Sequence, residues 1–404
     1  MMDLDGLDKN VQFGSYFKHT ETSLTKDIVF LNHGSYGTVP KRVAAAQTRY
    51  REEMERNPDL WFRQASLDHW LKAVSVLADF FHCHSQDLVL VPNASTGINS
   101  VLMSCKLKTG EAILITRLTY GSIQKATSHV TKRFEGTEAV FLDITFPISS
   151  AQQIVDLYEE CFKSHPNIKL AVIDYITSPS SVVMPVKELI TLCHHYSVLS
   201  VIDGAHTPGH IPLHLNDLDA DFFTGNLHKW LYAPRGCAIL WVKRDHHDWI
   251  YPVVTSWGYE FPLQIRFFKQ GTRDHTAEIC GMHAVQFYQA IGGMDRILKY
   301  TTGLINEAQE YLVKLLNTES LPIPKSMEVP NMRCILLSGI CGFPQSVVFD
   351  ESEKLILDIM NKSNIVCAFI CIEEKLFLRI SANVYNTMDD YRRLGEVLLH
   401  YHTA

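Results

Sequence analysis

The chain has 404 residues, of which 46% are hydrophobic and 20% charged, and its formal net charge is −7. This length predicts a large domain with a smaller companion, and the negative charge argues against a nucleic-acid or anionic-membrane partner. No apolar run approaches the ~20 residues that cross a bilayer. The acidic start has no signal-like core, and the ten cysteines form no regular framework. We therefore expect a cytoplasmic protein with reduced thiols and no metal site.

In chain order, helices are expected first, from Pro40 to about Asn57 and over residues 66–81. Between residues 88 and 242, short apolar runs alternate with amphipathic stretches. This alternation predicts a buried, mainly parallel sheet with helices on both faces. The expected strands are 88–91, 112–116, 139–142, 170–173, 199–202, 222–224 and 237–242. The expected helices are 96–105, 122–134, 151–164 and 186–196. The last two strands are too close for a crossover helix, so one strand should be antiparallel.

Beyond the sheet, residues 276–291 and 294–316 are expected to be helices, with Gly292-Gly293 as the break between them. The remaining residues mix strands (333–337, 365–372, 375–380) with helices (352–360, 388–401), which predicts a small α+β domain. The expected divisions are an N-terminal segment (1–39) packing on the small domain and the active site, a large domain (40–290) and a small C-terminal domain (291–404).

Two residues at the ends of neighbouring strands carry the strongest chemical signal. Asp203 ends an apolar strand in Val201-Ile-Asp-Gly-Ala-His206, and Lys229 follows the next strand in Gly225-Asn-Leu-His-Lys-Trp230. A lysine amine can form a Schiff base with the aldehyde of pyridoxal 5′-phosphate. A buried carboxylate needs a cationic or donor partner, which the protonated pyridine nitrogen of that cofactor supplies. The pair predicts a pyridoxal phosphate enzyme with Lys229 as its catalytic residue.

These motifs resemble the class V aminotransferase superfamily of fold-type I pyridoxal phosphate enzymes. The likeness is strongest to the branch of isopenicillin N epimerase, which includes cysteine desulfhydrases. It extends from Phe30-Leu-Asn-His-Gly-Ser-Tyr-Gly37 to Arg379-Ile-Ser-Ala-Asn-Val-Tyr-Asn-Thr387. The resemblance implies a seven-stranded, mainly parallel sheet and a homodimer with shared active sites.

Further cofactor contacts are assigned by position. Ser95 and Thr96 open a helix after the first strand, where backbone amides favour an anion such as the cofactor phosphate, although they also suit a plain helix cap. The resemblance places Asn226 and His228 near the same phosphate, Tyr120 on the face of the ring and His206 at the ring oxygen. It also places Gly271 and Thr272 at the phosphate of the partner subunit. Tyr120 could instead serve packing, and His228 could be structural.

Substrate contacts are expected from Arg379 and from the N-terminal segment. An arginine fork binds a carboxylate at two points, so Arg379 is expected to hold the α-carboxylate of an amino acid rather than a structural ion pair. The resemblance implies that Asn32, His33 and Tyr36 fold over the substrate, although they could also form a turn that closes onto the small domain. Asp174 and the turn 177–180 end the preceding strand at the same sheet edge, and Arg63 is a candidate second anionic contact.

The type of reaction depends on the fate of the carbanion that forms when the lysine removes the Cα proton. If the carbanion loses a sulfur group at Cβ, the enzyme is a lyase. If it is protonated on the opposite face, the enzyme is an epimerase, and if the cofactor carbon is protonated instead, it is an aminotransferase. Cys367 lies before Arg379 but in an apolar strand, where a cysteine is usually a small hydrophobic residue rather than a nucleophile. We expect a carbon–sulfur lyase of the cysteine desulfhydrase type. An amino-acid epimerase or aminotransferase, or a catalytically silent dimer acting as a scaffold, stays open.

Overall fold

A seven-stranded sheet forms the centre of the molecule. The computed structural model describes residue 4 and residues 7–340 and 342–401; most of the acidic start of the chain lies outside them. The strand order is β2-β8-β7-β6-β5-β3-β4, with bounds β2 (Leu88–Val91), β3 (Ala112–Thr116), β4 (Glu138–Leu142), β5 (Ile168–Asp174), β6 (Leu199–Asp203), β7 (Phe222–Asn226) and β8 (Ala238–Val242). Only β8 runs antiparallel to its neighbours, which confirms the expected topology.

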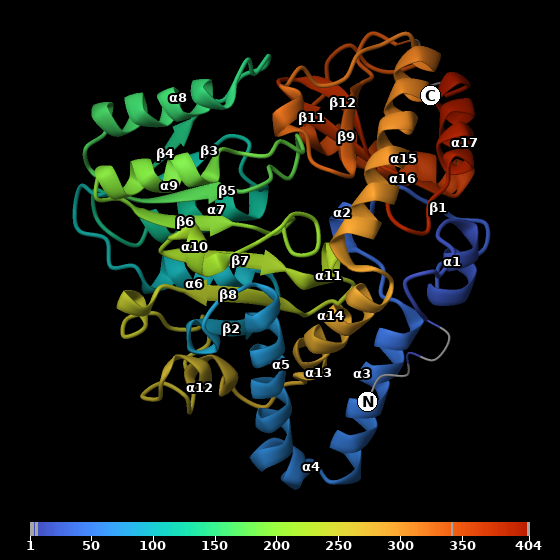
Figure 1. The fold of residues 1–404 in the computed structure, drawn as a ribbon. Helices are drawn as coiled ribbons and strands as arrows, with labels where there is room; N and C mark the ends of the chain where they lie inside the picture. Colours follow the sequence, from blue (N-terminus) through green and yellow to red (C-terminus); the bar gives the residue numbers. More distant parts are fainter. Residues whose placement is uncertain (1–3, 5–6, 341, 402–404) are drawn as a thin grey trace.

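Two layers of helices cover this sheet (Figure 1). The pair α8 (Ala151–Ser164) and α9 (Val186–His195) covers one face, and α6 (Ala94–Ser104) and α7 (Gly121–Thr131) lie on the other. Because both faces are covered, the strands β2, β3, β7 and β8 are buried along their whole length, as continuous apolar runs require.

The other helices connect the sheet to the two ends of the chain. Before it lie α1 (Ser15–Glu21), α2 (His33–Tyr36), α3 (Lys41–Arg56), α4 (Pro58–Leu60), a π-helical turn (Trp61–Ala65) and α5 (Ser66–Phe80). Within and after it lie α10 (Leu215–Leu218), α11 (Leu227–Trp230), α12 (Leu263–Phe268), α13 (Thr276–Ile279), α14 (Gly281–Ala290) and α15 (Gly293–Leu316). Short 3₁₀ turns occupy Ser85–Asp87, Arg244–His246 and Lys325–Met327. None of the helices in the described part of the chain has the length and hydropathy to cross a membrane.

The C-terminal part is built on a smaller antiparallel sheet with the order β11-β12-β9. Its elements are β9 (Met332–Leu336), α16 (Phe349–Ser363), β10 (Ile365–Val366), β11 (Ala368–Ile372), β12 (Lys375–Ser381) and α17 (Met388–Leu399). The N-terminal strand β1 (Val29–Phe30) pairs in parallel with β10, and Val29 and Leu31 join the separate apolar core of this part. We propose to keep the division at residues 39/40 and 290/291, because α15 begins at Gly293.

Two expected elements are interrupted. The expected strand 365–372 is divided at Cys367, because β10 pairs with β1 whereas β11 pairs with β12. The expected helix 276–291 is divided at Cys280 into α13 and α14. In both cases the apolar pattern continues through the break. For the strand, the break marks a change of partner from β1 to β12, which the local sequence does not show.

Candidate active site

The candidate site lies at the carboxyl ends of β5, β6 and β7. Because these strands are parallel, their last residues gather at one sheet edge, where α/β proteins bind ligands. Asp203 is the final residue of β6, and Lys229 lies in α11 directly after β7. The short helix α11 packs against α2, which brings the N-terminal segment to this edge.

The amine of Lys229 is buried and faces an imidazole. Its Nζ lies 3.0 Å from Nε2 of His206, and Nε1 of Trp230 donates to Nδ1 of the same ring at 3.4 Å. An indole N–H is a donor only, so the neutral His206 carries its proton on Nε2 and donates it to the amine. Burial, aided by the Arg379 cation, lowers the pKa of Lys229 from 10.5 to about 7, against an opposing effect of Asp203. A substantial fraction of this lysine is therefore neutral near pH 7.

The backbone of Lys229 is fixed by His33. Nε2 of His33 donates to the Lys229 carbonyl at 2.5 Å, and the Tyr385 hydroxyl donates to Nδ1 at 2.8 Å. Burial lowers the pKa of His33 to about 3, so the ring stays neutral. With both nitrogens engaged, His33 positions the lysine instead of facing the substrate. Gly37 has φ +66°, and a Cβ there would stand 1.9 Å from the His228 carbonyl oxygen, so only glycine allows this approach.

Asp203 has the environment that a cofactor ring nitrogen needs. The carboxyl is 5% exposed, and its one hydrogen bond within the described residues comes from the backbone N–H of Ala205, at 3.0 Å. Burial raises the pKa of Asp203, and Lys229 opposes that effect. A buried carboxyl with spare acceptor capacity fits a protonated pyridine nitrogen.

The beginning of α6 is organised as an anion site would be. Asn93 caps the helix by accepting from the backbone N–H of Thr96 at 2.8 Å and from its hydroxyl at 3.1 Å. Asn226 accepts from the backbone N–H of Ala94 at 2.9 Å, so it holds the helix start in place. Ser122, which the sequence did not single out, donates to the Ser95 hydroxyl at 3.5 Å. The hydroxyls of Ser95 and Thr96 thus gather at a helix N-terminus, which fits a phosphate.

Three other predicted residues lie at the margin of this site. His228 is partly buried and donates from Nδ1 to the Cys237 carbonyl at 3.3 Å, and burial lowers its pKa to about 4. Tyr120 is half-exposed, and burial of the rest of the side chain raises its pKa. Tyr36 is 70% exposed. The two tyrosines therefore present open aromatic surface.

Arg379 is a buried cation with neutral partners. Its Nη1 donates to the Ser178 carbonyl, and its Nη2 donates to Oδ1 of Asn32 at 3.2 Å and to the Ser35 hydroxyl at 3.0 Å. Within the described residues it forms no ion pair, although it is only 7% exposed. A buried guanidinium with neutral acceptors only has the charge and the donors that suit a carboxylate. Ser35 was missed as a separate residue, although it stands inside the Asn32–Gly37 motif.

The remaining predicted contacts lie away from this group. Gly271 and Thr272 are exposed on the segment after α12, where nothing stands within 4 Å of a Cβ built on Gly271. Arg63 is an exposed member of an ion pair with Asp59. Tyr385, which donates to His33, lies in the segment Arg379–Thr387 that carries the resemblance, but the sequence did not single it out as a site residue.

Comparison with known proteins defines the family. The sequence model of "Aminotransferase class-V" matches residues 29–394. A probable chloroplastic L-cysteine desulfhydrase of Arabidopsis thaliana is 27% identical, covering 92% of this chain and 82% of the relative. Isopenicillin N epimerase of Streptomyces clavuligerus is 26% identical, covering 93% and 95%.

Solved structures show the same fold. The cystine C–S lyase C-DES, in complex with its product cysteine persulfide, superimposes with a TM-score of 0.76 at 18% identity, covering 93% of this chain and 98% of that one. A variant of C-DES carries glycine covalently linked to its pyridoxal phosphate cofactor. The chain therefore belongs to the class-V aminotransferase family, and its fold-type I architecture and dependence on pyridoxal 5′-phosphate are confirmed.

Proposed function

We propose that this enzyme is a pyridoxal phosphate-dependent carbon–sulfur lyase that acts on cysteine or an S-substituted cysteine. The observation that carries the catalytic part is the buried amine of Lys229, which lies 3.0 Å from Nε2 of His206 and directly follows β7, the parallel neighbour of the strand that ends in Asp203. The reaction class is supported by the similarity to proteins named L-cysteine desulfhydrase and cystine C–S lyase.

The residues present fit the cofactor. When bound, pyridoxal phosphate withdraws electrons from the Cα of an attached amino acid. We propose that Lys229 is the lysine that bonds to the aldehyde and that Asp203 accepts from the ring N–H. Ser95 and Thr96 would hold the phosphate at the start of α6, with the Thr96 hydroxyl exchanging Asn93 for it, and Tyr120 would cover one ring face. His206 would donate to the ring oxygen once the lysine amine no longer needs its proton.

Lys229 is also the base that moves the proton. Because its pKa is about 7, the free amine can accept the Cα proton near neutral pH. Arg379 binds the α-carboxylate through its two N–H groups, with Asn32 and Ser35 keeping the fork in position. Arg379 would thereby fix the carboxylate end of the substrate. Tyr36 is the exposed aromatic of the same N-terminal segment and would contact the side chain of the substrate.

Proton removal sets up loss of the sulfur group. As the Cα–H bond gives its proton to Lys229, the electron pair released at Cα forms a double bond to Cβ, and the Cβ–S bond breaks with its pair on sulfur. Hydrolysis of the resulting enamine completes the reaction. For cysteine, the balance is cysteine and water giving pyruvate, ammonia and hydrogen sulfide. The leaving sulfide takes up one proton, which Lys229 can return.

A desulfurase reaction needs a cysteine nucleophile, and Cys367 does not suit that role. Its side chain is 1% exposed, and burial raises its pKa to about 12. A thiol in such surroundings stays protonated and inaccessible. Cys341 lies outside the described residues. A Cys341→Ser variant therefore tests whether this cysteine is the nucleophile of a desulfurase.

Product analysis distinguishes the possible reactions. The cofactor-loaded enzyme would be given L-cysteine, L-cystine or an S-alkyl cysteine sulfoxide, with pyruvate and sulfide measured in one sample. We expect equal amounts of both from cysteine, none with Lys229→Ala and normal yields with Lys72→Ala, an exposed lysine. A protein-bound persulfide lost in Cys341→Ser would favour a desulfurase. A D-amino acid would favour an epimerase, and a keto acid without sulfide an aminotransferase. No turnover of any substrate would favour the scaffold.

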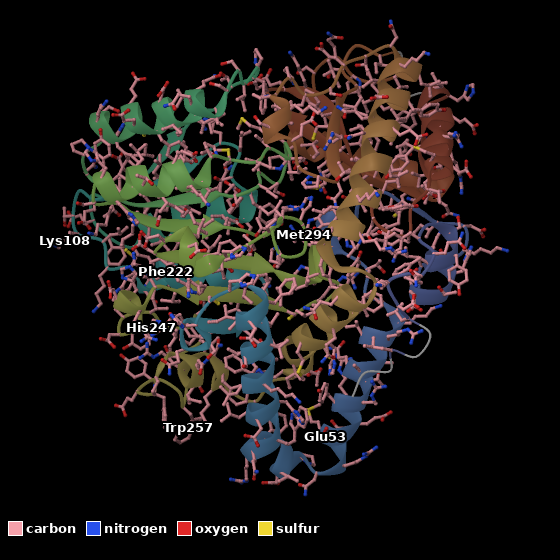
Figure 2. All side chains as sticks on the ribbon, viewed as in Figure 1. Glu53, Lys108, Phe222, His247, Trp257 and Met294 are labelled. Atoms are coloured by element: carbon pink, nitrogen blue, oxygen red, sulfur yellow. The ribbon has the colours of Figure 1, made fainter. Side chains whose placement is uncertain are left out.

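We further propose a homodimer with shared active sites, located in the cytoplasm. Gly271 and Thr272 are exposed and therefore free to reach a second subunit. The preceding segment carries exposed apolar side chains, including Trp257 at 87% exposure, which stands at the surface in Figure 2. Such a patch is typical of an interface. Light scattering would give the mass, and mixing inactive Thr272→Ala and Lys229→Ala chains should restore some activity only if subunits share sites.

A further inference from the structure

Asp174 is a buried carboxyl that the proposed reaction does not use. It is the last residue of β5 and 3% exposed. Unlike a surface carboxylate, it lies at the sheet edge that also carries Asp203.

The two carboxyl groups are neighbours on one face of the sheet. Asp174 is in parallel register with Asp203, so their side chains point the same way from strands about 4.8 Å apart. Neither forms an ion pair within the described residues. Burial and the neighbouring Asp203 raise the pKa of Asp174 well above its ordinary value. Two adjacent buried carboxyls hold a shared proton more readily than two charges.

Asp174 also holds the turn that carries Tyr120. The Thr119 hydroxyl donates to Oδ2 of Asp174 at 2.7 Å, and the next residue along this turn is Tyr120. Since Thr119 gives its proton to Asp174, the Thr116 hydroxyl, 3.2 Å away, donates to Thr119. This chain of three buried side chains links the end of β5 to the residue directly before Tyr120.

The other ionisable groups around the pair come from three elements. Tyr158 of α8 is buried, and its hydroxyl has no partner within the described residues. Lys229 of α11 lowers the pKa of Asp203, and Arg379 of β12 lowers the pKa of Lys229. A negative charge on Asp203 is balanced by the positive charge of Lys229 and Arg379. A second negative charge, on Asp174, would have no nearby cation of its own.

We propose that Asp174 is a positioning residue which, as an uncharged acid beside Asp203, holds Thr119 and the Tyr120 turn against the cofactor ring. This inference rests on the proposed cofactor site. It assigns the single negative charge of the pair to Asp203, where the ring nitrogen needs it. The role of Asp174 is geometric, so an uncharged group of the same shape should replace it.

The test compares Asp174→Asn, which keeps an acceptor and cannot ionise, with Asp174→Ala, which removes the acceptor. The readouts are the cofactor dissociation constant and the visible circular dichroism of the bound cofactor, which reports ring asymmetry independently of turnover. We expect Asp174→Asn to stay within about twofold of wild type and Asp174→Ala to weaken cofactor binding about tenfold with altered dichroism, because the buried Thr119 hydroxyl loses its acceptor. Thr119→Val should weaken cofactor binding by a smaller factor, whereas Thr119→Ser, which keeps the hydroxyl, should bind the cofactor like the wild type.

Each contrary result is decisive. Wild-type binding and dichroism in Asp174→Ala would overturn the positioning role. Equal losses in Asp174→Asn and Asp174→Ala would show that a charge is required and overturn the uncharged acid. If Asp174→Ala does not fold, wild-type values in Thr119→Val would overturn the link to Tyr120. Failure of the wild type to bind cofactor would instead refute the proposed function itself.

Discussion

Replacing Lys229 by methionine should stabilise the cofactor-free protein. The pKa of this lysine falls from 10.5 to about 7 on folding, chiefly because the amine is buried. Between these two values the unfolded chain binds a proton that the native state does not, so the native state loses stability as the pH falls towards 7. Below about 7 both states are protonated and the loss stays constant. Methionine has a similar length and carries no proton, so it removes this loss.

The size of the gain can be worked out from the same two values. At about 1.4 kcal/mol per pH unit, the loss is about 4 kcal/mol near pH 7 and about 2 kcal/mol near pH 9. The methionine variant also loses the hydrogen bond between Lys229 and His206, which costs about 1 kcal/mol. The net gain in the free energy of unfolding is therefore about 3 kcal/mol near pH 7 and about 1 kcal/mol near pH 9.

Urea unfolding of the cofactor-free proteins at both pH values, at one protein concentration, measures this gain. Lys72→Met is the matched control, because this lysine is exposed, and we expect it to change stability by less than about 0.5 kcal/mol. A gain for Lys229→Met that does not shrink as the pH rises would refute the reasoning, as would a loss of stability at both values.

Other predictions concern the neighbours of the lysine. Arg379→Gln should raise KM for the amino acid about 100-fold, since a buried carboxylate loses its partner, and Arg379→Lys should recover part of that loss; an unchanged KM would place the carboxylate elsewhere. Gly37→Ala should lower the free energy of unfolding by about 2 kcal/mol or more, because its Cβ would collide with the His228 carbonyl oxygen. A urea midpoint equal to that of the wild type would contradict the close contact between Gly37 and His228. Tyr385→Phe removes the donor to His33 and should cost about 1–2 kcal/mol, whereas wild-type stability would show that this hydrogen bond contributes nothing.

The sheet could be predicted because its strands are buried on both faces. Each strand is a short apolar run, and the polar residues that end β6 and follow β7 are Asp203 and the Lys229 motif. The local pattern therefore indicates both the strand and the chemistry at its end.

The support around the lysine could not be predicted in the same way. His33 and Tyr385 are 352 positions apart, and no local pattern joins them. The division of β10 from β11 has the same origin, since it depends on pairing with the distant strand β1. The motif suggested that His33 touches substrate, whereas its two nitrogens are engaged by Tyr385 and the lysine backbone.

The most direct test of the central assignment is to reduce the cofactor-loaded protein with borohydride and map its peptides by mass spectrometry. The account predicts one stable phosphopyridoxyl group per chain, on the peptide that contains Lys229, and none on the Lys229→Ala protein. A group attached to a different lysine, or unmodified Lys229 in a protein that retains the cofactor, would contradict it.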